Sequence, residues 1–175
     1  MNIPIDESRY VISLKEVFWG GTLLSVTMAL HGLGMIAILR VNGALNRHFE
    51  AKPTFHSGLF ILILTSWLIM VVHLIEVIVW SLFFYWKEAF PTGSLSYYFA
   101  LNEYTTIGSN YNLPLHWRLL EGMIATAGLM TFAWSTGVLL TLAQDFQQQQ
   151  MTLLKQKRAR QKANPELLHP GESHG

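Results

Sequence analysis

Three stretches of the chain almost lack charged side chains and are long enough to cross a lipid bilayer. Residues 17–39 contain no Lys, Arg, Asp or Glu, and residues 57–86 contain only Glu76. Residues 119–142 form the third stretch, with Glu121 near its start. A spanning helix needs about 20 apolar residues, because lipid offers no partner to loose backbone groups. The pattern therefore predicts three transmembrane helices.

The composition supports an all-α integral membrane protein. Hydrophobic residues make up 51% of the chain and charged residues 13%, against a usual charged share of about 25%. The net charge of +1 provides no basic field for nucleic acid, and the absence of cysteine excludes disulfides and thiolate chemistry. No set of residues suggests a nucleophile with its acid and base, so we expect no enzyme.

The distribution of Lys and Arg predicts the orientation. Eight lie in or after the cytoplasmic ends of the predicted spans: Arg40, Arg47, Lys52, Lys155, Lys157, Arg158, Arg160 and Lys162. Four lie on the other side: Arg9, Lys15, Lys87 and Arg118. The positive-inside rule places the N-terminus outside and the C-terminus in the cytoplasm of a multi-pass cell-membrane protein. The basic tail either binds anionic lipid or, as we favour, anchors the last span.

The segment between the second and third stretches has a distinct pattern. Pro91, Thr92 and Gly93 interrupt the chain, after which Ser94 is expected to cap a helix over residues 95–104. This helix has half the length needed to cross a membrane. We expect a strand to follow it at residues 105–110, so that the segment enters the membrane and returns. The alternative is an ordinary extracellular loop.

The residues that follow this short helix carry a resemblance. Thr105 to Pro114 read T-T-I-G-S-N-Y-N-L-P, which resembles the T-T-V-G-Y-G-D-x-x-P filter pattern of the potassium-channel pore family. The phrases W-R-L-L-E-G at 117–122 and F-A-W-S-T at 132–136 look like small bacterial ion-channel proteins with one extra helix before the two-helix pore. The resemblance covers residues 57–143.

The resemblance implies a fold and a division of the chain. It implies three transmembrane helices, a re-entrant pore helix with a filter between the second and third, and a homotetramer. The expected parts are an extracytoplasmic segment 1–16, an extra transmembrane helix 17–39, a cytoplasmic loop 40–56, a pore domain 57–143 and a basic cytoplasmic tail 144–175.

The resemblance also implies a selectivity filter. Its residues are Thr106, Ile107, Gly108, Ser109 and Asn110, with K⁺ held by the first three. Stacked backbone carbonyls replace the water shell of the ion. Ser109 replaces the bracing aromatic residue and Asn110 the second glycine, so we expect reduced discrimination between K⁺ and Na⁺.

Two further positions of the pattern differ. Asn102 occupies the place of a pore-helix glutamate and Tyr111 that of the acid after the filter. We therefore expect no carboxyl pair behind the filter.

The third stretch has a regular pattern of its own. Gly128, Phe132, Thr136 and Leu140 recur every four residues. By resemblance Gly128 is a hinge and the others line an inner cavity. The alternative is that these positions pack against helices or lipid, with glycine allowing close contact.

Three buried polar residues form a second candidate site. His73 and Glu76 share one helix face, and His31 lies at a similar depth in the first stretch. We favour a hydrogen-bonded pin between helices. Proton sensing, or metal binding by all three, are the alternatives.

Together these features favour a pore-forming subunit of a tetrameric cation channel that conducts K⁺ passively. We expect no cofactor beyond permeating K⁺ and Na⁺, and as partners other copies of the chain, the lipid bilayer and K⁺, without nucleic acid. The alternatives are a non-conducting channel-like scaffold or subunit, and a membrane metal-binding protein.

Overall fold

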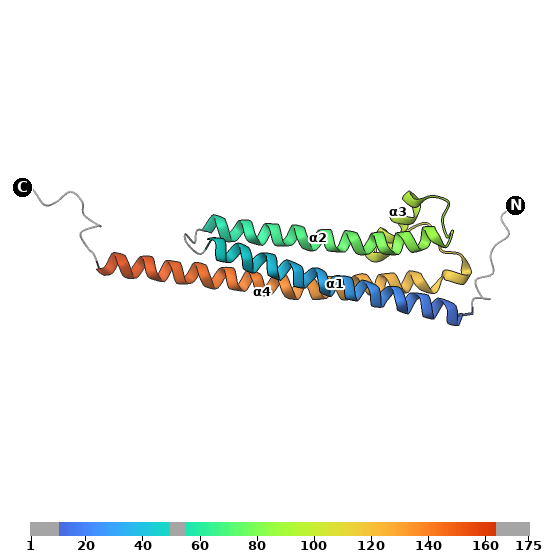
Figure 1. The fold of residues 1–175 in the computed structure, drawn as a ribbon, viewed down its shortest axis with the longest axis horizontal. Helices are drawn as coiled ribbons and strands as arrows, with labels where there is room; N and C mark the ends of the chain where they lie inside the picture. The colour runs from blue at the N-terminus through green and yellow to red at the C-terminus, as the bar shows by residue number, and fades with distance from the viewer. Residues whose placement is uncertain (1–10, 50–54, 164–175) are drawn as a thin grey trace, which may run out of the picture.

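A computed structural model describes residues 11–49 and 55–163 as an all-α protein (Figure 1). Its elements are α1 (Leu14–Phe49), α2 (Phe55–Trp86), α3 (Gly93–Tyr104), a 3₁₀ turn η2 (Leu115–Trp117) and α4 (Leu119–Ala163). The three long helices run side by side, and short α3 lies at one end of them (Figure 1). At the opposite end α4 extends beyond the other two.

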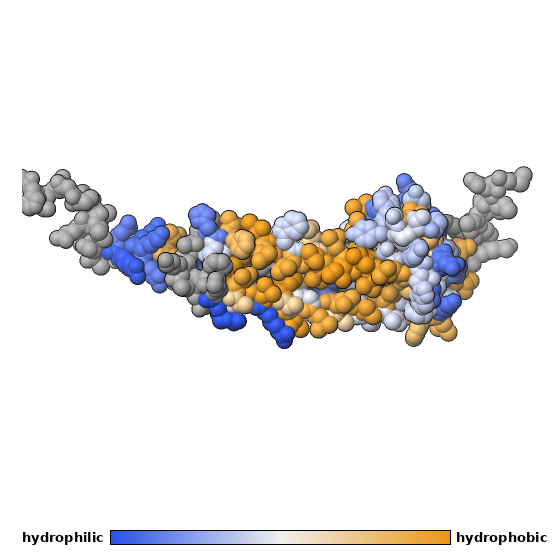
Figure 2. All heavy atoms as spheres, turned by 45° about the horizontal axis from the view of Figure 1, so that its top comes forward, coloured by the Kyte–Doolittle hydropathy of each residue, from blue (hydrophilic) through white to orange (hydrophobic). Residues whose placement is uncertain are grey.

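Three helices are long and apolar enough to cross a membrane, as predicted. Their apolar regions lie in Leu14–Arg47, His56–Trp86 and Leu115–Gln161, with mean hydropathies of 1.9, 2.5 and 1.5. On the face that Figure 2 shows, apolar side chains cover the middle of the bundle and polar residues gather toward its two ends. This arrangement is that of a helical membrane protein with several spans.

The helices extend beyond the apolar stretches that predicted them. α1 continues through ten residues of the expected 40–56 loop, to Phe49, and α2 begins at Phe55. No proline lies between Leu14 and Phe49, and a helix satisfies its own backbone groups wherever it leaves the lipid. Residues 1–10, 50–54 and 164–175 of the predicted N-terminal segment, loop and tail lie outside the described residues.

The start of α3 differs from the expectation. The helix begins at Gly93, and Thr92 rather than Ser94 is its N-cap. The Thr92 hydroxyl oxygen accepts a hydrogen bond of 3.2 Å from the N–H of Leu95, which satisfies one of the free donors of the first turn. Since Thr92 follows Pro91 directly, the helix begins as soon as the chain has turned.

An aromatic core holds α3 against the long helices. Trp80 and Phe84 of α2 and Phe99 of α3 are completely buried. The rings of Phe90 and Phe99 lie 4.8 Å apart, and those of Phe84 and Phe99 5.5 Å apart. Buried aromatic side chains contribute large apolar areas with defined ring geometry, so this core fixes the position of α3 on α2.

Candidate functional site

The last residue of α3 is clamped from two sides. The side chain of Tyr104 is buried, and its hydroxyl donates a short hydrogen bond to Glu76 on α2. Its main-chain carbonyl lies against Gly128 on α4, where an added Cβ would be 1.9 Å from the oxygen. Gly128 is therefore required by the close approach of α3. This packing contact is a physical reason for the glycine that is independent of any hinge.

The segment after α3 begins as a capped turn instead of the expected strand. The N–H groups of Ile107 and Gly108 both donate to the Asn102 carbonyl, over 3.0 and 3.2 Å. Thr106 has φ 61° and Gly108 has φ 77°. A returning residue in the left-handed region satisfies the free carbonyls at a helix end, and glycine usually fills that position. A β-branched residue there is strained, and such strain often marks functional sites.

One carboxylate, that of Glu103, lies behind this segment. Oε1 of Glu103 accepts a 3.0 Å hydrogen bond from the N–H of Ser109. Asn102, which stands where the pattern that the chain resembles has a glutamate, donates to the Tyr98 carbonyl. Burial raises the pKa of Glu103, and the hydrogen bond from Ser109 opposes part of this effect. The acid was missed because it lies one residue after the position that the resemblance marks.

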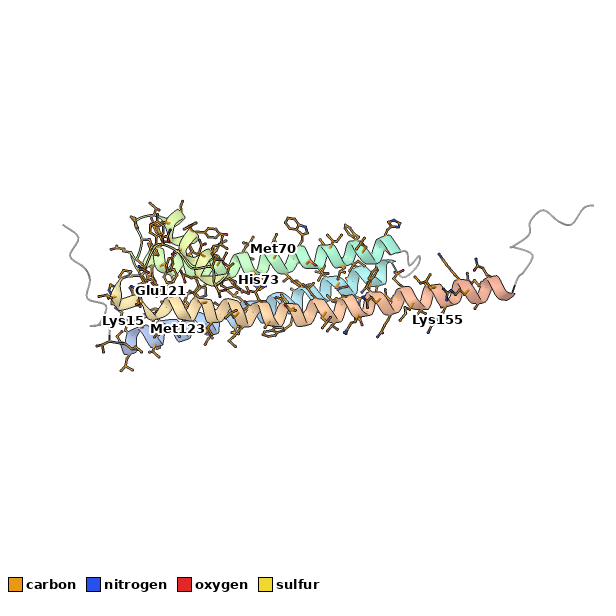
Figure 3. All side chains as sticks on the ribbon, turned by 180° about the vertical axis from the view of Figure 1, so that it is seen from behind. Lys15, Met70, His73, Glu121, Met123 and Lys155 are labelled. Atoms are coloured by element: carbon orange, nitrogen blue, oxygen red, sulfur yellow. The ribbon has the colours of Figure 1, made fainter. Side chains whose placement is uncertain are left out.

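Glu121 fastens the other end of the connection to α4. Its Oε1 accepts a 2.7 Å hydrogen bond from the Leu113 N–H, and its Oε2 lies 3.2 Å from Nε of Arg118. Figure 3 shows Glu121 at the end of the bundle where α3 lies and Lys155 at the opposite end. The loop between α3 and α4 is thus held at both ends by carboxylates, at Ser109 and at Leu113.

The structure brings His31, His73 and Glu76 together between the helices. Nδ1 of His31 lies 2.9 Å from Oε1 of Glu76, and Nδ1 of His73 lies 3.6 Å from Oε2. His73 instead hydrogen-bonds through Nδ1 to the Tyr104 hydroxyl at 2.9 Å. Glu76 and His31 are completely buried. The three residues therefore link α1, α2 and α3.

α4 completes this polar cluster. The Ser135 hydroxyl lies 3.0 Å from Nε2 of His73 and 3.2 Å from Nε2 of His31. The Thr131 hydroxyl lies 2.6 Å from that of Tyr104. Sequence reasoning missed Tyr104, Thr131 and Ser135. These residues could have been predicted from the sequence, because they lie at the same depth as the polar residues of the other predicted helices.

A metal site formed by these three residues fits the geometry less well than a hydrogen-bonded link between the helices. One ligand atom from each of His31, His73 and Glu76 can be chosen so that all lie within 4.8 Å of one another. Each of these side chains already has hydrogen-bond partners, and no buried side-chain donor or acceptor in the described part of the chain lacks one. A metal ion would have to break these bonds to bind.

The α4 stripe has two different surroundings. Gly128 is buried under the Tyr104 carbonyl, whereas Phe132 and Leu140 are 40% and 58% exposed and Thr136 is also exposed. Ile107 of the segment after α3 is 77% exposed. These residues are therefore available for contacts outside the single chain.

The fold and these contacts define a class: an all-α protein with three helices able to span a membrane and a short helix between the second and third. Comparisons with protein-family models, with curated proteins and with solved structures found no match.

Proposed function

We propose that the protein is the pore-forming subunit of a tetrameric, potassium-channel-like cation channel, with its N-terminus outside. The observation that carries this proposal is the depth reached by α3. Tyr104 hydrogen-bonds to Glu76, ten residues before the end of α2 at Trp86. At 1.5 Å per residue, the end of α3 lies about 15 Å from the end of α2 along that helix, and we take this as a depth near the middle of a bilayer core of about 30 Å.

The exposure of the segment after α3 supports the same proposal. Thr106, Ile107 and Gly108 are exposed in the single chain, although they begin at this depth. Non-helical backbone within the hydrocarbon region is tolerated only where protein buries it or water reaches it. In a ring of four copies around one axis, neighbouring copies cover one side of the segment and a water-filled path for ions lies on the other.

In such a ring the carbonyls of Thr106 and Ile107 form the inner cation sites. The short α3 directs the negative end of its dipole toward the cavity below, which favours a cation there. Ser109 and Asn110 leave the outer sites less firmly braced, so the penalty that separates Na⁺ from K⁺ is smaller. We accordingly expect both ions to pass.

Ion flux into liposomes tests the function. The purified protein is expected to carry K⁺ and Na⁺ with a modest preference for K⁺, and Ser109→Tyr with Asn110→Gly is expected to raise that preference. The matched control is Ser94→Ala, at an exposed position in the first turn of α3, the end of the helix away from the segment. A tetramer that passes neither ion, as native protein or as double variant, would support the alternative of a non-conducting scaffold.

A further inference from the structure

The polar side chains between the four helices close into a ring of five hydrogen bonds. Glu76 is bonded to His31 and Tyr104, Ser135 is bonded to His31 and His73, and His73 is bonded to Tyr104. Each member thus has two neighbours in the ring. All five side chains are buried, and His73 is the most exposed at 8%.

The number of hydrogens in this ring is fixed by its chemistry. Each link needs one hydrogen, which a hydroxyl or a neutral imidazole supplies once and a carboxylate does not supply. Two neutral histidines with an ionised Glu76 therefore provide four hydrogens for five links. The Ser135 hydroxyl lies between Nε2 of His31 and Nε2 of His73 and can donate to only one of them, so the tautomers of the two histidines decide which link lacks its hydrogen.

We propose that the ring binds one additional proton, shared among His31, His73 and Glu76, and that this proton holds the end of α3 in place. With a protonated His31 and an ionised Glu76, the bonds run from His31 through Ser135, His73 and Tyr104 to the carboxylate. With a protonated Glu76 they run in the opposite direction. Both arrangements fill all five links.

The charge of the site also indicates one additional proton. The titratable groups that face Glu76 are His31 from α1, His73 from α2 and Tyr104 from α3. In the part of the chain that the structure describes, α4 contributes only Ser135 and Thr131 to the cluster, and neither titrates. With the additional proton the ring is neutral, and without it one negative charge is buried among apolar helices, where charge is costly.

The ring is joined directly to the segment after α3. Tyr104 is the last residue of the helix, and its carbonyl lies against Gly128. When the additional proton leaves, two acceptors face each other at one link, so the ring opens and Tyr104 is released. A cavity of about 340 Å³ is lined in part by His73, Tyr104 and Ser135, and in this proposal it is the side from which protons reach the ring. The effect on conduction rests on the proposed function.

A proton count tests the site without any ion flux. Nitrogen-15 NMR of histidine-labelled protein in micelles at neutral pH reports the protonated nitrogens of His31 and His73, assigned from the single His→Gln variants. The infrared carboxyl band that disappears in Glu76→Gln reports Glu76. We expect three protonated nitrogens with an ionised Glu76, or two with a protonated one. Any other count, or loss of these protons on adding Zn²⁺, overturns the proposal.

A variant of Glu76 tests the coupling to α3. In Glu76→Gln the amide N–H can donate to Tyr104 and the amide oxygen can accept from His31, so neutral histidines fill the ring with no additional proton. As the pH rises, native flux is expected to fall about tenfold, the effect of losing one buried hydrogen bond, while Glu76→Gln holds its flux. Ser25→Ala, which removes an exposed hydroxyl of α1 outside this cavity, is expected to keep the native profile.

The two tests fail in different ways. If Glu76→Gln follows the native pH profile, the ring does not hold α3 and the coupling is wrong. If neither protein passes ions, the proposed function is wrong, and the proton count still decides whether the ring exists.

Discussion

Replacing Gly128 with alanine tests the contact that places α3 in the bundle. The new Cβ would lie 1.9 Å from the Tyr104 carbonyl oxygen and 2.9 Å from its carbon. Carbon–oxygen contacts are normally about 3.3 Å or longer, so α3 and α4 must separate by about 1.4 Å. The clash involves main-chain atoms, which no change of rotamer relieves. We therefore expect a loss of about 3 kcal/mol, the upper end of the usual cost of overpacking.

Thermal melting in detergent measures this loss. For a chain of this size 1 kcal/mol corresponds to about 2–4 °C, so Gly128→Ala is expected to melt about 6–12 °C lower. The matched control is Gly137→Ala on the same helix, where a Cβ meets nothing within 4 Å. Alanine favours a helix over glycine by about 1 kcal/mol, so the control should be unchanged or slightly more stable. Equal melting temperatures for the two variants would refute the close contact.

Two further substitutions test α3. Thr92→Ala removes the N-cap of α3 and is expected to lower the free energy of unfolding by about 1 kcal/mol, which lowers the melting temperature by about 2–4 °C. The control Ser94→Ala should leave the melting temperature unchanged. Equal effects of the two substitutions would contradict Thr92 as the N-cap. Burial raises the pKa of Glu103 above 4.5, so the folded state disfavours its ionised form and native stability should fall as the pH rises through that range. Glu103→Gln keeps an acceptor for the Ser109 N–H and should remove this pH dependence in melting curves; an unchanged dependence would exclude Glu103 as its source.

Hydropathy and spacing predicted the long helices, the short helix between the last two, and the meeting of His31 with His73 and Glu76. These features follow from the cost of exposing polar groups to lipid, which acts on every residue of a span. His31 and Glu76 lie at a similar depth in two predicted helices, and this was enough to predict that they meet. The exact helix ends were not predicted, because a helix can continue into the polar boundary at little cost.

The contacts that join the elements could not be read from the sequence. Ser135 and Tyr104 bond to residues far away along the chain, and their partners depend on how the helices rotate about their axes. Close packing at Gly128 was one of the two expectations for this glycine, but its partner, the Tyr104 carbonyl, is revealed only by the position of α3. The turn after α3 was missed because Thr106, a β-branched residue, rarely adopts the left-handed conformation that this cap requires.

The central claim is that residues 106–110 of several copies enclose the path of the ions. The chain contains no cysteine, so Asn110→Cys carries one reactive thiol at the exposed end of this segment and Glu88→Cys carries one at an exposed site at the end of α2. Both proteins are treated in liposomes with a charged, water-soluble thiol reagent, and mass spectrometry measures the labelled fraction. The account predicts that labelling abolishes cation flux through Asn110→Cys and leaves flux through Glu88→Cys unchanged. Full labelling of Asn110→Cys with undiminished flux would contradict it.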